Sequence, residues 1–304
     1  MFKNEVAEFI YKRTYSRWIE EENRREDWPE TIERFIGFIR EERPDIPEKT
    51  EEKIRKYMTE FAVMPSMRFL WAAGPAAKAD NTTIYNCSFA KMNSVDAFAE
   101  CLYVLMCGTG FGFSVEQEEI EKLPEIPVIK SGQPLPKIMI EDSKAGWADS
   151  VKTLMNSLYE GQNVYFNYDA IRPEGARLKT MGGRASGPAP LIKLHDFLRE
   201  TMHNAQGRKL TPLEAHDICN QIAEIVVVGG VRRSSQISLS DLDDQEMRHA
   251  KDWPYPIKRA MANNSAIYRE KPTAAQFLQE WGSLAQSGTG ERGIFNLEAA
   301  QSKA

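Results

Sequence analysis

Apolar residues recur every three or four positions through the first sixty residues, which is the period of an amphipathic helix. The pattern predicts helices within 5–21, 28–42 and 47–64. Pro29 and Pro47 stand near the starts of the second and third helices, where the missing amide proton of proline is tolerated. We therefore predict an N-terminal helical region, residues 1–62, that caps a core.

From about residue 80, short runs of β-branched and aromatic residues alternate with longer stretches of helical period. The predicted strands are 82–90, 110–116, 163–171, 234–241 and 263–268. The predicted helices are 94–107, 143–161, 187–207, 211–230 and 273–288. Strands separated by helices are typical of α/β proteins, because parallel neighbours need a crossover connection. Residues 63–304 are therefore predicted to form one α/β body with largely parallel strands.

Composition excludes several classes of function. The 304-residue chain has a net charge of −5, so no global basic field attracts it to nucleic acid or to an anionic membrane. No run of 18 apolar residues predicts a transmembrane helix, and the N-terminus lacks the apolar stretch of a signal peptide. Its four cysteines contain no CxxC pair and its histidines number only four, so no metal site is predicted. We expect a cytoplasmic globular protein.

Three glycine-rich stretches could approach a ligand closely. The first, "CGTGFGF" at 107–113, follows a helix and enters a strand, which is the reverse of the dinucleotide-binding order, so that function is excluded. The second, 178–191, combines glycines and prolines with Lys179 and Arg184 and leads into a helix whose N-terminus could accept an anion. In the third, 226–236, a glycine pair is typical of an ordinary helix end.

One cysteine differs from the others in its surroundings. Cys87 lies between Asn86 and Ser88 in a strand-like run, which suits a strand end that faces a pocket. An inert core thiol is the alternative, since cysteine is among the most buried residue types. Cys101, Cys107 and Cys219 are predicted on apolar helix faces, and we expect them to be inert.

Nine segments, in one order along nearly the whole chain, resemble the adenosylcobalamin-dependent (class II) ribonucleotide reductases, in particular the ribonucleoside-triphosphate reductases. They are "YKRTYSRW…RREDWPETIERF" (11–35), "MPSMRFLW" (64–71), "NCSF" (86–89), "GTGFGFSVE" (108–116), "GWADS" (146–150), "IRPEGARLKTMGGRASGPAPLI" (171–192), "LTPLEAHDICNQIAEIVVVGGVRRSS" (210–235), "NNSAIY" (263–268) and "GIFN" (293–296). Each segment is weak alone, and their common order makes the resemblance specific.

The resemblance implies a fold and a reaction. The family has a ten-stranded α/β barrel, so residues 63–304 are expected to be its first, incomplete half after the helical cap. The family removes the 2′-hydroxyl of ribonucleotides by thiyl-radical chemistry, with adenosylcobalamin as the radical source and thioredoxin or a similar protein as reductant, and so supplies DNA precursors. Two cysteines provide the electrons and end as a disulfide. The resemblance identifies Cys87 as one of this pair.

The resemblance also implies binding residues. Substrate contacts are expected at Ser66, Asn86, Ser88, Gly108 and Gly110. The site of a dNTP effector and its specificity loop, 178–188, is expected to include Asn93, Ser94, Lys179, Gly182, Gly183, Arg184 and Ser186. No residue is assigned to a metal or to the cobalamin.

Two departures from the family change the expected function. The Asn-x-Cys-x-Glu motif that carries the thiyl cysteine does not occur before Ala304, and the second reductant cysteine is missing as well. We therefore expect the chain to be inactive without its C-terminal half, which is expected as a partner on another polypeptide. The chain could be a truncated reading frame, one product of a split gene, or a fragment that is later joined to its other half. Eighteen residues separate Phe89 from Gly108, where monomeric relatives carry more, so the resemblance leaves a homodimer open.

Two alternatives follow from these departures. The chain could be a non-catalytic dNTP-binding module, which a missing catalytic half favours. It could also be a thiol enzyme unrelated to nucleotides, but the sequence offers no His/Asp constellation to activate Cys87.

Overall fold

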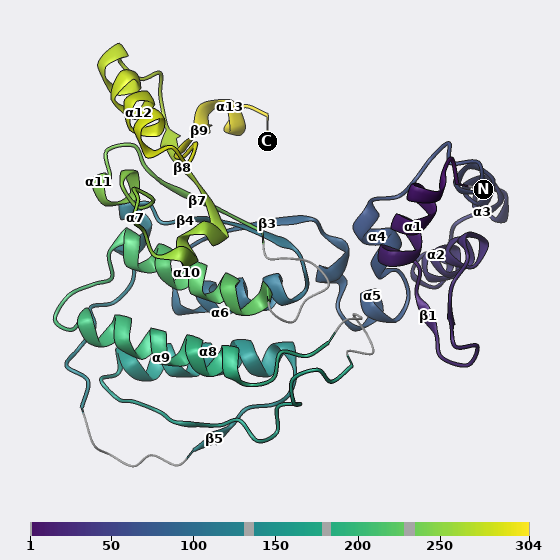
Figure 1. Cartoon of the computed structure of the whole chain (residues 1–304), viewed down its shortest axis with the longest axis horizontal. Helices are drawn as coiled ribbons and strands as arrows, with labels where there is room; N and C mark the ends of the chain where they lie inside the picture. The colour runs from purple at the N-terminus through teal and green to yellow at the C-terminus, as the bar shows by residue number, and fades with distance from the viewer. Residues whose placement is uncertain (1, 131–136, 178–183, 228–234, 304) are drawn as a thin grey trace. The chain divides into compact units, whose positions relative to one another are not determined.

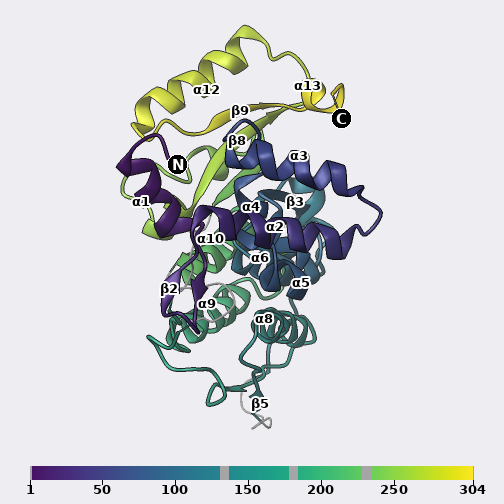
Figure 2. The same cartoon turned by 90° about the vertical axis from the view of Figure 1, so that its right-hand side faces the viewer.

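The computed structural model describes residues 2–130, 137–177, 184–227 and 235–303. The chain divides into two compact units, Met1–Asn86 and Cys87–Ala304, each with its own set of secondary-structure elements (Figures 1 and 2).

The first unit is mainly helical. Its helix α2 begins with a capping box, in which Asp27 and Glu30 each bind the other's backbone amide, and Pro29 stands in its first turn as predicted. The apolar side of α2, with Ile32, Phe35 and Ile36, is buried. The elements are α1 (Glu5–Thr14), β1 (Trp18–Ile19), β2 (Arg24–Arg25), α2 (Trp28–Glu42), α3 (Glu48–Thr59), α4 (Met67–Ala72), α5 (Pro75–Ala79) and the 3₁₀ helix η1 (Asn81–Ile84).

The helix predicted over 5–21 is wrong beyond Thr14. Strands β1 and β2 instead form an antiparallel ribbon that turns the chain back on itself. The buried Glu26 holds this turn: its carbonyl accepts from Ser16 Oγ at 2.6 Å and its carboxylate accepts from the Arg17 amide at 3.1 Å. These bonds satisfy a buried charged residue, which a continued helix would leave unpaired.

The second unit is built around a parallel sheet. In the described residues, five strands lie in the order β3-β4-β7-β8-β9, and every neighbouring pair is parallel. These strands are β3 (Cys87–Lys91), β4 (Gly110–Ser114), β7 (Gln236–Asp241), β8 (Ala262–Tyr268) and β9 (Gly293–Asn296). The predicted α/β class with parallel strands is therefore confirmed.

Helices line one face of this sheet in two layers (Figure 1). Phe111 and Phe113 of β4 point into a core shared with α6 and α10, and α8 and α9 pack beyond them. Thr211 and Glu214 form a capping box at the start of α10, each accepting from the other's backbone amide. The remaining elements are α6 (Val95–Met106), α7 (Gln117–Ile120), β5 (Ile138–Met139), α8 (Lys144–Tyr159), β6 (Phe166–Asn167), α9 (Ala189–Asn204), α10 (Pro212–Val227), α11 (Gln245–Arg248), η2 (Ile257–Met261), α12 (Ala274–Ser287) and α13 (Leu297–Gln301).

Two predicted strands are shorter than the sequence suggested. Of 82–90, only the part from Cys87 onward is strand, because Asp80 accepts from the Thr82 amide at 3.0 Å and starts a 3₁₀ turn. Of 163–171, only Phe166–Asn167 pairs, with β5. β-Branched and aromatic residues favour strands only where a neighbouring strand is available.

None of the helices in the described ranges combines the length and apolar character that crossing a membrane requires.

Candidate functional site

The second face of the sheet is exposed where β3, β4, β7 and β8 lie side by side. Phe89 is 54% exposed and Ile237 is 38% exposed, although both belong to a hydrophobic sheet. Asn263 is the exposed residue of β8, whose other six residues are buried. Backbone register places these side chains in one row, Phe89–Gly112–Ile237–Asn263. We call the surface formed by this row and Cys87 the open face.

Gly112 keeps the row flat. A Cβ atom at this position would lie 3.0 Å from Cδ2 of Phe89 and 3.3 Å from Cγ2 of Ile237. Any larger residue would therefore push both neighbours aside. At Gly112 the backbone of the open face is therefore accessible between two apolar side chains, and another group can approach it closely.

Cys87 is the first residue of β3 and is exposed. It pairs in register with Gly110 of β4, which presents no side chain beside the thiol. Ser88 points to the opposite face, and its hydroxyl donates to the Gly110 carbonyl at 2.9 Å. The structure thus brings the predicted reductant Cys87 together with Ser88 and Gly110, two of the substrate residues that the resemblance implies. Ser88 ties β3 to β4 and does not face the open side.

The other three cysteines lie away from the open face. Cys101 and Cys219 are fully buried in α6 and α10, and burial raises the pKa of the Cys219 thiol. Cys107 is fully buried at the C-cap of α6, where Lys144 donates to its sulfur at 3.1 Å. Each was predicted to be an inert core thiol, and their burial agrees with that prediction. None of them can therefore meet Cys87 without unfolding of the core.

Gly108 and Ser66 have local structural roles. The amide of Gly108 donates to the Leu105 carbonyl at 2.8 Å, in the left-handed turn that joins α6 to β4. Ser66 is the N-cap of α4 and accepts from the Phe69 amide at 3.1 Å. Ser66 and Asn86 belong to the first unit, and Asn86 is an exposed residue directly before Cys87 in the chain.

Asn93 and Ser94 order the turn between β3 and α6. Ser94 is the N-cap of α6 and accepts from the Ala97 amide at 3.3 Å. Asn93 donates to Glu119 at 2.8 Å, and Lys91 donates to the same buried carboxylate at 2.6 Å. Burial alone would raise the pKa of Glu119. Hydrogen bonds from Lys122, Lys91 and Asn93 outweigh the effect of burial and lower that pKa to about 2. Glu119 is therefore a charged carboxylate at neutral pH.

Part of the predicted specificity loop forms a stem. The Ala185 amide donates to the Ala176 carbonyl at 2.8 Å, and the Gly175 amide donates to the Ala185 carbonyl at 2.9 Å. Arg184 donates to the Gly175 carbonyl at 2.9 Å, and Ser186 is half-buried beside it. Lys179, Gly182 and Gly183 lie outside the described residues.

A Ser–His–Tyr cluster in the helical layers resembles a catalytic triad, but its hydrogen bonds are structural: His195 of α9 links Ser150 of α8 to Tyr168. Ser150 donates its proton to the Trp147 carbonyl at 2.7 Å, so Nε2 of His195 must donate to Ser150 Oγ at 3.0 Å. Tyr168 then donates to Nδ1 at 2.8 Å. Burial, and next the charge of Arg199, lower the pKa of His195 to about 3. A neutral histidine with both nitrogens occupied cannot take the serine proton.

Within the described ranges, His, Cys, Asp and Glu side chains form no group of three or more that could hold a metal ion.

The row of the open face was missed at the sequence level. Phe89 and Ile237 look like ordinary core residues in the sequence, because alternation along one strand does not reveal which sheet face is covered. Asn263 gave no distinguishing signal either, because the equally polar Asn264 and Ser265, which are buried, follow it directly.

The fold and the sequence are both similar to one family of proteins. The ribonucleotide reductase alpha domain is the family model that matches the chain, over residues 1–75. The fold agrees with a crystal structure of a B12-dependent (class II) ribonucleotide reductase, at a TM-score of 0.80 and 25% sequence identity over 95% of this chain.

The similar proteins of known sequence are adenosylcobalamin-dependent ribonucleoside-triphosphate reductases. The one from Lactobacillus helveticus is 27% identical over 98% of this chain and 49% of its own length, and the one from Euglena gracilis is 29% identical over 87% and 39%. The chain thus spans about half the length of the relatives it matches, and 49% of the matching solved chain. The resemblance to the N-terminal part of class II reductases is therefore confirmed.

Proposed function

We propose that this chain is the N-terminal part of an adenosylcobalamin-dependent ribonucleoside-triphosphate reductase, with Cys87 as one of its two reducing thiols. The observation that carries the proposal is the exposed thiol on the open face of a parallel sheet whose fold matches a class II reductase. The strands follow one another in chain order, as they do in a barrel wall, which supports the first half of a ten-stranded barrel.

The reduction that we propose requires two thiols. Replacing the 2′-hydroxyl by hydrogen consumes two electrons: two thiols become a disulfide, the hydroxyl leaves as water, and carbon gains one hydrogen. Cys87 supplies one thiol, and Cys101, Cys107 and Cys219 are too deeply buried to supply the other. The second thiol and the thiyl cysteine are therefore proposed to belong to the half of the relatives that this chain does not match. Thioredoxin or a similar dithiol protein then reduces the disulfide.

The proposal includes adenosylcobalamin, because the relatives are named for it. When bound, it supplies the organic radical that starts the reaction. The described residues give no contact that we assign to its corrin ring, so we derive no step through it. We place the protein in the cytoplasm, where reducing conditions keep thiols such as Cys87 free.

A dNTP effector and a homodimer complete the proposed partners. The alignment with the Lactobacillus helveticus relative extends over 372 positions, more than this chain contains, so the relative has additional residues within the matched part. In monomeric members, by resemblance, such residues replace a dimer partner beside the effector site. A second copy is proposed to take that role here.

Calorimetric titration of dNTPs tests the proposal, with the 304-residue chain alone and with the C-terminal half of the Lactobacillus helveticus relative. We expect dNTP binding, and ribonucleotide reduction only when both halves are present. Binding without reduction in any mixture would instead identify a non-catalytic dNTP-binding module. Absence of both binding and reduction would contradict the proposed function.

Arg184→Ala is expected to alter base preference in the assembled enzyme. Arg184 ties the loop stem to the Gly175 carbonyl, and loss of one exposed hydrogen bond loosens the stem by about 1 kcal/mol. Relative turnover of the four ribonucleotides, measured with each effector, should change by about fivefold, since 1 kcal/mol corresponds to that factor. The matched control is Arg43→Ala, which removes an exposed arginine–aspartate pair in the first unit. Unchanged preference for all four substrates would remove Arg184 from the specificity loop.

A further inference from the structure

On β7 and β8, the exposed part of the open face lies near the start of each strand. Ile237 is the exposed residue of β7 and Asn263 that of β8. Two residues further along, Leu239 and Ser265 belong to the same face but are only 4% and 8% exposed. Helix α13, which follows β9, packs against β8. The accessible surface therefore lies at the same end of the sheet as Cys87, the first residue of β3.

Asn263 is the polar side chain in the row Phe89–Gly112–Ile237–Asn263. It forms no side-chain hydrogen bond with any residue in the described parts of the chain. An asparagine amide has two N–H donors and a carbonyl acceptor, and exposure leaves them available to a ligand. The next residue, Asn264, faces the core and is buried. Asn263 is therefore the hydrogen-bonding group that β8 presents to the open face here.

A largely buried ion pair fixes the backbone on both sides of Asn263. Lys251 donates to the Ala262 carbonyl and, at 2.6 Å, to the carboxylate of Glu291. The same carboxylate accepts from the Asn264 amide at 2.8 Å. Strand β9 pairs only with the later part of β8, so this ion pair takes the place of a neighbouring strand. The Asn263 amide thus stands on a backbone of fixed position, as a binding residue requires.

The rest of the row suits a nucleobase. The row contains no charged side chain, and the backbone at Gly112 is accessible between Phe89 and Ile237. Proteins bind nucleobases by stacking against their flat faces and by hydrogen bonds to their edges. A triphosphate group instead favours cationic side chains or several N–H donors, which this row does not offer. The row is therefore matched to the uncharged end of a nucleotide.

The separation of Cys87 and Asn263 agrees with a nucleoside that lies between them. Their strands are three positions apart in the sheet, and Asn263 shares its row with Phe89, two residues after Cys87. With about 4.8 Å between strands and about 3.3 Å per residue, their Cα atoms lie about 16 Å apart across the sheet. Both side chains extend over the surface and shorten this gap. A sugar held at the thiol can therefore place the edge of its base at the amide.

We propose that Asn263 binds the base of the ribonucleotide substrate while the sugar lies at Cys87. The inference rests on the proposed function and adds a binding residue on β8 to that site. A half-turn of the amide presents either its donors or its acceptor, and the edges of the four bases differ in just these groups. Asn263 therefore holds every substrate base without selecting one, and the choice among bases is made elsewhere.

Steady-state reduction of CTP tests the proposal, with the 304-residue chain and the C-terminal half of the Lactobacillus helveticus relative. Asn263→Ala is expected to raise KM about fivefold, the factor that corresponds to one hydrogen bond. The value of kcat should be unchanged, because the base contact is made equally in the ground state and the transition state. The thermal midpoint of the chain should also be unchanged, since Asn263 is exposed and forms no hydrogen bond with the described residues.

Ribose 5-triphosphate, which lacks a base, is the decisive probe. Its inhibition constant should be equal for wild type and Asn263→Ala, because the contact that alanine removes is made only to the base. Weaker inhibition of Asn263→Ala would instead show a contact to the sugar or the phosphates and would overturn the proposal. An unchanged KM for CTP in this variant would overturn it as well.

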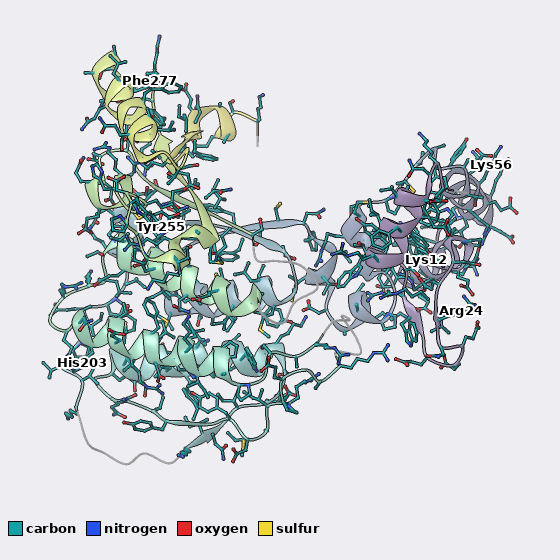
Figure 3. All side chains as sticks on the ribbon, viewed as in Figure 1. Lys12, Arg24, Lys56, His203, Tyr255 and Phe277 are labelled. Carbon is teal, nitrogen blue, oxygen red and sulfur yellow. The ribbon has the colours of Figure 1, made fainter. Side chains whose placement is uncertain are left out.

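Asn204→Ala is the matched control, because Asn204 is an exposed asparagine at the end of α9. Figure 3 shows its neighbour His203 in the outer helical layer, on the covered side of the sheet. This variant should leave KM unchanged. Reduction by wild type with an unaltered KM in Asn263→Ala rejects the base contact alone. Absence of reduction by wild type contradicts the proposed function, and this inference with it.

Discussion

Replacing Cys87 by serine is expected to abolish ribonucleotide reduction by the assembled enzyme. Serine preserves the size and exposure of the side chain at the start of β3 but cannot form a disulfide, so the reduction loses one of its two electron-donating thiols. Turnover coupled to thioredoxin should fall at least about 1,000-fold, which is typical for loss of an essential nucleophile. Binding of dNTPs, measured by calorimetry, should be unchanged, because Cys87 points to the open face rather than toward the turn at Asn93.

Cys107→Ala provides the comparison for this variant. Its thiol is fully buried at the end of α6, on the helical side of the second unit, so turnover should be retained. Wild-type turnover of Cys87→Ser would remove Cys87 from the reducing pair, whatever the behaviour of the control.

Mild acid is expected to destabilise the second unit by about 4 kcal/mol between pH 7 and pH 5. Burial lowers the pKa of His195 and of His216 to about 3 in the folded chain, whereas unfolded histidine titrates near 6.5. Below pH 6.5 the unfolded state therefore binds the extra protons, so the stability that is complete above 6.5 is lost as the pH falls toward 3. Each histidine contributes about 2 kcal/mol over this interval, a large share of a typical total stability.

Urea unfolding at several pH values measures this effect. His195→Gln should be less stable at pH 7, because it loses its bonds to Ser150 and Tyr168, but its stability should depend less steeply on pH by about one proton. Replacement of the exposed His203 by glutamine should leave the slope unchanged. Equal slopes in wild type and His195→Gln would show that the buried histidine is not the acid-sensitive group.

Local patterns in the sequence predicted much of the fold. The position of Pro29 at the start of α2 and the parallel α/β class depend on patterns of neighbouring residues, and both are confirmed. The helix predicted over 5–21 was wrong beyond Thr14. The observed end depends on the buried Glu26, which lies twelve residues further along the chain. Long-range partners of this kind leave no periodic trace in the sequence.

The candidate site was predictable only at Cys87 and its immediate neighbours. The polar residues beside Cys87 indicated an exposed thiol, and the structure confirms its exposure. The row from Phe89 to Asn263 comes from four strands whose register is set by tertiary packing, so no single segment reveals it. The effector residues Asn93 and Ser94 remain predictions, although the structure gives both an ordering role in the turn.

The chain-order arrangement of the strands has a consequence for biosynthesis. After β3, each strand of the order β3-β4-β7-β8-β9 pairs with a strand of this sheet that precedes it in the chain, so no strand has to wait for a later one. The sheet can therefore form progressively while the ribosome is still translating, with short loop closures at most steps. In the part of the chain that the structure describes, β9 leaves an unpaired edge, which is the type of surface that chaperones and aggregation both recognise. Prompt covering of this edge should thus determine how much of the protein stays in solution in the cell.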